Sequence, residues 1–310
     1  MNSSPLFQLL SDHLREMRRS KPALRLGIVL PDGELGFLEA LWTHLEARWF
    51  EPVLILRERY SETVRASLSD DKQFKFTVTS GNDDCVQTEA IRLIRDRQLD
   101  LIVLPPGSGW DFAEELQKSA EDILPPDAAA YALTMPLKLE RPLLIGDLFA
   151  ETSGGANRLA KVARLGGNLL NTLGIEPPRA ALLTAVETVS EGIPATVVAR
   201  QTEELFSDNR DVLVQGPLSL DLAISPHAAE KKKVGGEVAG RADLLIGPNL
   251  TVSRGVYQAL TCLCEEPSAV ALAGGPVPVA LAGKCEGPMG VVLSTLFAGI
   301  LASSSSSNLY

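Results

Sequence analysis

Short apolar runs alternate with segments of helical periodicity along most of the chain. Leu24–Leu30 is the first run, and Phe37, Leu38, Leu41 and Leu45 after it recur at the spacing of one helix face. The other runs that resemble strands are Pro52–Leu56, Phe74–Val78, Leu101–Leu104, Leu143–Ile145, Ala180–Leu183, Val212–Val214, Leu244–Ile246 and Val277–Leu281. Strands separated by helices favour a parallel sheet that is covered on both faces, so the pattern predicts an α/β fold.

The segment Ala156–Leu173 has the clearest helical period. Its apolar side chains can line one face, while Arg158, Lys161 and Arg164 are expected to face solvent. Thr152-Ser153-Gly154-Gly155 comes directly before it, so hydroxyls and amides gather at a helix N-terminus. Such an end attracts anions, but Ser and Thr are also common helix caps. The pattern alone leaves both interpretations open.

Length and charge limit the classes of protein that fit. A chain of 310 residues is near the practical limit of one hydrophobic core, which predicts two domains or one large α/β unit. Lys and Arg total 29 against 39 Asp and Glu, a formal charge of -10. General binding to nucleic acid or to anionic membranes needs a basic surface and is therefore not expected. An anionic small molecule in a local basic pocket stays compatible with this charge.

The ends of the chain and its cysteines favour a soluble, cytoplasmic protein. The N-terminus lacks the apolar core of a secretory signal. The apolar stretch Val291–Ala302 is shorter than the roughly 20 residues that span a bilayer, and predicts a buried helix instead. The 4 cysteines do not suit a disulfide scaffold or a zinc site, and no bound metal is expected.

Candidate chemistry gathers after two strands that are each followed by Gly-Pro. Gly216-Pro217 leads to Ser219 and Asp221, and Gly247-Pro248 leads to a second polar group, which consists of Asn249, Thr251, Ser253 and Arg254. Ligands of open parallel sheets bind beyond the carboxyl ends of the strands. These loops therefore predict a site for a small anion or a cofactor. No nucleophile elbow, Walker loop or dinucleotide-binding G-x-G-x-x-G accompanies them.

Three motifs stand in a fixed order along the second half of the chain: G-P-x-x-x-D-x-A at Gly216–Ala223, V-A-G-x-A-D-L-L at Val238–Leu245 and P-N-L-x-x-x-x-x-x-Y at Pro248–Tyr257. Their order and spacing resemble those of the phosphate acetyltransferases and, more closely, the phosphate butyryltransferases. The resemblance is most specific over Gly146–Leu260 and continues more loosely to Leu24 and Ala302.

The resemblance implies an architecture of two α/β/α domains with largely parallel sheets, related to isocitrate and isopropylmalate dehydrogenases, with a cleft between the domains. It places residues 1–145 and 278–310 in the first domain and residues 146–277 in an inserted second domain. It also implies a homodimer.

The activity implied by the resemblance is the transfer of a short acyl group between CoA and inorganic phosphate. The substrates are then CoA, acyl phosphate and phosphate, with CoA as a substrate and not as a permanently bound cofactor. The residues expected to be catalytic are Asp221, Arg254 and Lys284. Those expected to bind substrate are Asp147, Thr152, Ser153, Gly216, Pro217, Asn249, Ser253 and Gly283.

The chain departs from the family pattern at several cationic positions. The family Lys-Gly after the strand Leu101–Leu104 is replaced by Pro105-Pro106-Gly107, and the family Ser-Arg pair falls on Gly283-Lys284. Two alternatives to the enzyme therefore stay open. One is a relative that has lost the reaction and binds CoA or acyl phosphate or is structural. The other is a different enzyme of the dehydrogenase-like fold, although the acidic metal-ligand cluster of that class is not evident.

Overall fold

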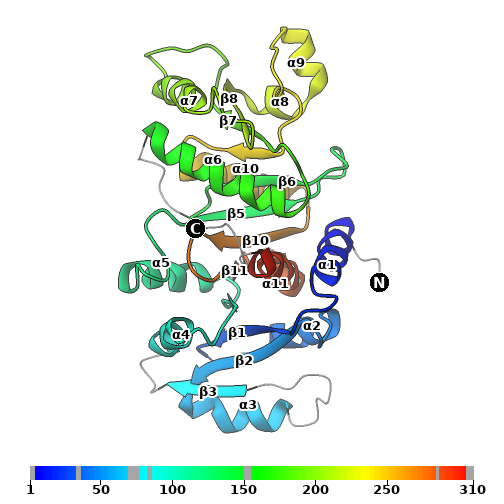
Figure 1. Cartoon of the computed structure of the whole chain (residues 1–310), viewed down its shortest axis with the longest axis vertical. Helices are drawn as coiled ribbons and strands as arrows, with labels where there is room; N and C mark the ends of the chain where they lie inside the picture. The colour runs from blue at the N-terminus through cyan, green and yellow to red at the C-terminus, as the bar shows by residue number, and fades with distance from the viewer. Residues whose placement is uncertain are drawn as a thin grey trace. The chain divides into compact units, whose positions relative to one another are not determined.

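The computed structural model describes residues 4–32, 36–68, 77–81, 86–149, 155–283 and 286–304. Its residue contacts form two compact units (Figure 1). Unit 1 combines Met1–Ala128 with Pro267–Tyr310, and unit 2 is the continuous segment Ala129–Glu266. The expected division at residues 145/146 and 277/278 stays a prediction about the domains.

Unit 1 is built on a mostly parallel sheet with the strand order β3-β2-β1-β4-β11-β10. The strands are β1 (Leu24–Leu30), β2 (Phe50–Arg57), β3 (Thr77–Gly81), β4 (Leu101–Val103), β10 (Ser268–Ala273) and β11 (Val279–Leu281). β1 pairs in parallel with β2 and β4, and the pair β10 and β11 is antiparallel. The described end of the expected strand Phe74–Val78 falls in β3, and its first residues lie outside the described part.

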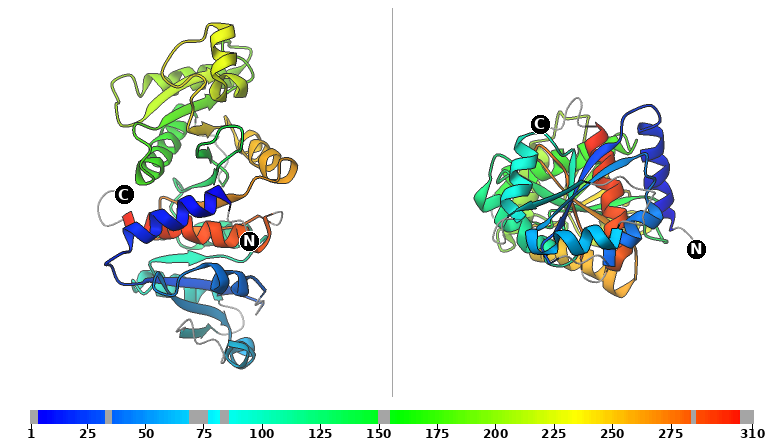
Figure 2. Two further views of the ribbon diagram at one scale, coloured as in Figure 1. Left: turned by 90° about the vertical axis from the view of Figure 1, so that its right-hand side faces the viewer. Right: turned by 90° about the horizontal axis from the view of Figure 1, so that it is seen from below.

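Helices cover the unit 1 sheet: α1 (Pro5–Met17), α2 (Gly36–His44), α3 (Ser61–Leu68), α4 (Val86–Arg95), α5 (Gly109–Ser119) and α11 (Gly287–Ser304), with a short 3-10 turn at Glu58–Tyr60. α11 packs against α1, α2 and the strands β10 and β11. It is apolar almost all round, as expected for a helix inside a core. Figure 2 shows α1 and α11 lying side by side.

α11 is also the one helix of the described chain that is long and apolar enough to cross a membrane. However, 72% of its 18-residue apolar window is buried inside the protein. This burial is typical of a core helix and agrees with the buried helix predicted over Val291–Ala302.

Unit 2 contains a second run of strands in the order β5-β6-β9-β7-β8. They are β5 (Ala129–Thr134), β6 (Leu143–Gly146), β7 (Arg179–Leu183), β8 (Leu213–Leu218) and β9 (Leu244–Ile246). β6, β9, β7 and β8 run in parallel, whereas β5 and β6 are antiparallel. β8 is the last strand of this order, so among the described residues no strand lies beside its outer edge.

Side chains alternate between the two faces of the unit 2 sheet, and helices cover both. Leu245 and Ala181 pack against α8 (Leu220–Ile224), α9 (Pro226–Lys232) and α10 (Leu250–Gln258). Leu244 lies close to Gly166 of α6 (Gly155–Thr172). α6 in turn packs against α7 (Pro194–Glu204), and a π-helical turn at Ala259–Leu263 follows α10. The predicted α/β class with a mostly parallel sheet is confirmed, while the dehydrogenase-like detail stays a prediction.

Candidate functional site

The ends of β6 and β9 meet at the carboxyl edge of the unit 2 sheet, where Gly146 is in register with Ile246. Ser253 holds the two ends together, because its Oγ donates to the Gly146 carbonyl oxygen at 3.0 Å and accepts from the Gly247 amide at 3.2 Å. Its side chain is fully buried. Ser253 thus positions the two loops, and a contact with substrate stays a prediction.

Asn249 begins α10 at the same edge. Its Oδ1 accepts a hydrogen bond from the Val252 amide at 3.0 Å, and the residue is exposed. A capped helix start of this kind presents amides and the positive end of the helix dipole. Asn249 is thus a helix cap, and the anion site that the sequence predicts after Gly247-Pro248 stays a prediction.

Arg254 brings a guanidinium group to this edge. Its Nε donates to the Leu148 carbonyl oxygen at 2.9 Å, so the side chain joins α10 to the loop that follows β6. The residue is half-buried. A cation fixed by one of its nitrogens is preorganised for binding an anion, which is what electrostatic catalysis requires.

Asp147 lies immediately after β6 and is fully buried. Its carboxylate pairs with Arg158 and accepts from the amides of Ala130 and Phe149 at 3.0 and 2.8 Å. Burial raises the pKa of Asp147, although the charge of Arg158 and the amide bonds oppose that shift. The carboxylate is therefore used within the protein, where it fixes the loop after β6.

Arg158 corrects one expectation from the sequence. It was expected to face solvent on α6, but it is only 8% exposed, because it reaches Asp147. A helical wheel assigns every arginine to the polar face and cannot anticipate a buried partner in a distant loop.

A second pair of loops follows β7 and β8. Ser219 Oγ donates to Asp221 Oδ1 at 2.5 Å, and this hydrogen bond contributes most to lowering the pKa of the exposed Asp221 carboxyl. Lys232 of α9 pairs with Glu187 in the loop after β7 at 3.2 Å, and its charge also lowers the pKa of Asp221. Neither Glu187 nor Lys232 was expected to be a site residue, because no local motif links either of them to Asp221.

The remaining predicted site residues lie in different places. Gly216 and Pro217 are buried inside β8, and a Cβ at Gly216 would come within 2.6 Å of Leu182 Cβ. Gly283 belongs to unit 1, where its amide donates to Glu286 Oε2 at 2.8 Å. Thr152, Ser153 and Lys284 lie outside the described residues.

Unit 1 has its own pocket of about 300 Å³ beyond the carboxyl ends of β1 and β4. The two strands are neighbours, and β2 lies on the other side of β1, so this is the topological switch point of the sheet. The polar side chains in its lining are Asp32, Ser108 and Asp111. No basic side chain is among the described residues that line it, and Arg57 nearby pairs with Asp32 at 3.2 Å. The described lining of this pocket is therefore acidic, and the loss of a family lysine here stays a prediction.

No group of three or more His, Cys, Asp or Glu side chains suited to a metal ion occurs among the described residues. The absence of a bound metal stays an expectation.

The family described as phosphate acetyl/butaryl transferase matches residues 124–281, about half of the chain. The phosphate acetyltransferase of Thermotoga maritima is 31% identical over 164 residues, which are 51% of this chain and 56% of that protein. The phosphate butyryltransferase of Clostridium acetobutylicum is 31% identical over 152 residues, which are 48% and 50% of the two chains. The chain thus spans about half the length of the curated relatives it matches.

Solved structures share the fold over nearly the whole chain. A branched-chain phosphotransacylase from Enterococcus faecalis superposes with a TM-score of 0.76 at 22% identity, covering 89% of this chain and 99% of that one. A phosphotransacetylase from Streptococcus pyogenes gives 0.75 at 17% identity, with 95% and 98% covered. At these identities the superpositions support the fold alone, and the family assignment rests on the sequence match. The chain belongs to the phosphate acetyl/butaryl transferase family.

Proposed function

We propose that this protein transfers a short acyl group between CoA and inorganic phosphate. The family match carries the proposal, because residues 124–281 include every loop at the carboxyl edge of the unit 2 sheet. The edge supplies what this chemistry needs from a protein, namely a fixed cation, a helix start and a carboxylate.

The proposed reaction proceeds by direct attack on the acyl carbon. The sulfur of CoA forms a bond to the carbonyl carbon of an acyl phosphate, the bond from that carbon to the phosphate oxygen breaks, and phosphate leaves with the electron pair. The thiol proton passes to a base. In the reverse direction a phosphate oxygen attacks the thioester and CoA leaves as the thiolate. Neither direction needs a covalent enzyme intermediate or a permanently bound cofactor.

The roles of Arg254, Asn249 and Asp221 are supported by their place at the carboxyl edge of the unit 2 sheet, and that of Lys284 by the family resemblance alone. Arg254 stabilises the negative charge that develops on the acyl oxygen or the phosphate, with Lys284 as a second cation and Asn249 at the helix start. Asp221 is the proposed base. Its lowered pKa keeps it ionised at neutral pH but weakens it as a base. A thiol has a pKa of about 8.5, so the cations must also lower the pKa of the thiol.

The setting of the reaction is part of the proposal. We propose a cytoplasmic homodimer that acts on small molecules and binds neither nucleic acid nor membranes, which is supported by the formal charge of -10. Thr152, Ser153 and Gly283 are proposed as further substrate contacts, as are Gly216, Pro217, Asp147 and Ser253.

A thioester assay tests the activity directly. The purified protein is mixed with CoA and acetyl, propionyl or butyryl phosphate, and thioester absorbance is followed. We expect turnover that depends on both substrates. No turnover with any of the three at high enzyme concentration would contradict the proposal. In that case, stabilisation by CoA alone, about 2.7 kcal/mol at 100 times Kd, would favour a relative that binds CoA without reacting.

Arg254→Gln tests the fixed cation. Loss of one group that stabilises the transition state is expected to lower kcat/KM by about 100- to 1000-fold. Arg241→Gln is the matched control, since Arg241 is exposed and outside the loops of the edge. Unfolding of both variants is measured in parallel, because Arg254 also holds Leu148. If Arg254→Gln and Arg241→Gln have the same kcat/KM and the same free energy of unfolding, Arg254 does not take part in catalysis.

A further inference from the structure

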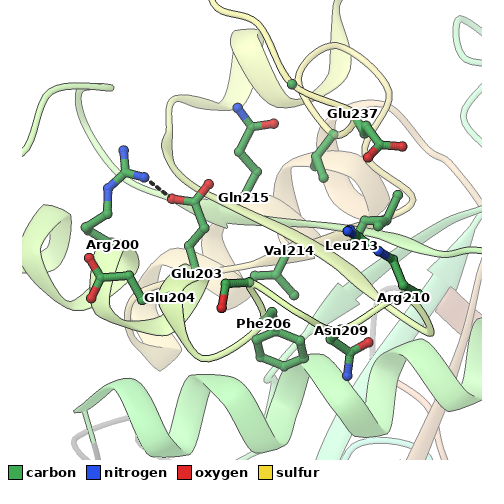
Figure 3. A pocket seen from close by; sticks show the side chains of 13 residues that line it. Arg200, Glu203, Glu204, Phe206, Asn209, Arg210, Leu213, Val214, Gln215 and Glu237 are labelled. Carbon is green, nitrogen blue, oxygen red and sulfur yellow. Dashed lines mark hydrogen bonds and ion pairs between the residues drawn. The ribbon is translucent and has the colours of Figure 1, made fainter.

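The exposed edge of β8 forms the floor of a cavity of about 470 Å³, separate from the carboxyl edge. The cavity follows Leu213, Val214 and Gln215 at the amino half of the strand, whereas the candidate site lies beyond its carboxyl end. One wall comes from the end of α7 and the segment after it, and the other from Gly236–Val238 (Figure 3). We call this cavity the edge pocket.

The two walls belong to opposite faces of the sheet. α7 packs with α6 on one face, and Val238 packs in the cluster of α8 and α9 on the other. The edge pocket therefore wraps around the free edge of a strand. A groove of this shape fits an extended chain that adds to the sheet as a further strand.

The backbone of β8 has groups available for such pairing. The Leu213 amide donates to the Pro178 carbonyl oxygen at 2.9 Å, so Leu213 faces β7. Alternate residues of a parallel strand bond to opposite sides, and Val214 and Gly216 therefore face outward. The Gly216 backbone lies close enough to the Glu203 carboxylate to lower its pKa, while no hydrogen bond between described residues involves the outward amide or carbonyl of Val214.

The charges of the edge pocket are polarised. Glu204 and the ion pair of Arg200 with Glu203 lie at one end, at the C-terminus of α7, and Arg210 lies at the other end (Figure 3). A helix C-terminus favours a positive group. Burial raises the pKa of Glu203, which indicates that this end of the edge pocket is partly desolvated. A cation bound there would stabilise the ionised carboxylate. Arg210 and Glu237 have no side-chain partner within the described part of the chain.

We propose that the edge pocket binds a short extended peptide as an additional strand on β8. Its ammonium group lies against Glu204 and its carboxylate against Arg210, and a basic side chain near the carboxylate pairs with Glu237. A tripeptide is long enough to fill the edge pocket. Three residues of β8 line it, and a paired extended peptide has the same length per residue as the strand. The lining carries two arginines and three glutamates, which agrees with a ligand of net positive charge.

Binding of the tripeptide Ala-Val-Lys to the whole protein tests the proposal. Isothermal titration at low salt is expected to show saturable binding. N-acetyl-Ala-Val-Lys-amide, which lacks both terminal charges, and free lysine, which lacks the chain, are each expected to bind at least 10-fold more weakly, equivalent to about 1.4 kcal/mol. No binding of Ala-Val-Lys, or equal binding of the blocked peptide, would overturn the proposal.

Two further measurements separate strand addition from loose surface attraction. Arg210→Gln is expected to weaken Ala-Val-Lys at least 10-fold, while Arg241→Gln, an exposed arginine outside the pocket, leaves binding unchanged. Hydrogen exchange of the Val214 amide should slow when the peptide binds. Binding that leaves this amide unprotected, or that survives in Arg210→Gln, contradicts the proposal. These readouts are independent of acyl transfer.

Discussion

At the scale of single residues, the pair of Asp147 and Arg158 decides the shape of the loop after β6. Asp147 is fully buried and Arg158 nearly so. Two backbone amides donate further hydrogen bonds to the Asp147 carboxylate. Charges buried in this way specify one loop conformation, because any other conformation would leave a charge unpaired in the interior.

Asp147→Asn should therefore destabilise the protein by about 3–5 kcal/mol, since it leaves the Arg158 charge buried without its partner. Chemical denaturation measures the loss. Asn157→Ala, an exposed position on the same helix, is the control and should change the free energy of unfolding by at most about 0.5 kcal/mol. A similar small loss in Asp147→Asn would mean that the pair does not hold the loop.

A second carboxylate gives a prediction about pH. Arg25 of β1 binds Asp100 through its backbone amide at 2.7 Å and through its guanidinium at 2.7 and 3.1 Å. Burial raises the pKa of Asp100, but these bonds and the charge of Arg25 outweigh it, and the pKa lies below its usual value. A lowered pKa stabilises the fold above the unfolded pKa of about 3.9, and that contribution disappears as pH falls through the folded pKa.

The stability difference between the natural protein and Asp100→Asn should thus be constant near neutral pH and shrink below about pH 4. Denaturation at several pH values measures it. A difference that grows on acidification would reverse the sign of the effect and exclude this cause.

At the scale of elements, α6 fits the unit 2 sheet through glycine. A Cβ added at Gly166 would lie 2.7 Å from a Leu244 methyl carbon and 2.9 Å from the Tyr131 ring. Gly255 on α10 has no neighbouring atom within 4 Å of an added Cβ. Substitution of Gly166 therefore tests close packing against the sheet, whereas substitution of Gly255 tests helix propensity alone.

Gly166→Ala is expected to destabilise the protein by about 1–3 kcal/mol through overpacking. Gly255→Ala is expected to stabilise it by about 0.5–1 kcal/mol, because alanine favours a helix interior and has fewer unfolded conformations. Thermal unfolding of both variants decides the matter. Changes of the same sign would show that packing against β9 does not control α6.

The apolar pattern predicted most strands and the helix α6, but it did not predict α1, although Leu6, Leu10 and Leu14 recur there at helical spacing. β5 and β10 were not predicted, because alanine, which is depleted in strands, makes up much of Ala129–Thr134 and Ser268–Ala273. Both strands are fully buried, and tertiary packing rather than propensity stabilises them. In the candidate site, the order of motifs found the loops at the carboxyl edge. It could not anticipate the bond of Arg254 to Leu148, which joins segments 106 residues apart.

At the scale of the whole molecule, α11 supplies much of the core of unit 1. Phe297 is completely buried on it. Phe297→Ala should cost about 3–5 kcal/mol, because it removes apolar contacts and leaves a cavity. Leu137→Ala, at a side chain that is 74% exposed, is the control and should cost at most about 0.5 kcal/mol. Calorimetry measures both, and comparable losses would contradict a central role for α11.

The order of strands in unit 1 has a consequence for synthesis of the chain. β4 lies between β1, which precedes it, and β11, which begins only at residue 279. On the ribosome, the N-terminal strands therefore emerge with the edge of β4 unpaired while the whole of unit 2 is still being made. Unit 2 is continuous in sequence and has all its strands before β10 appears. Unit 2 can thus mature before unit 1, because the sheet of unit 1 is completed only after β10 and β11 have been made.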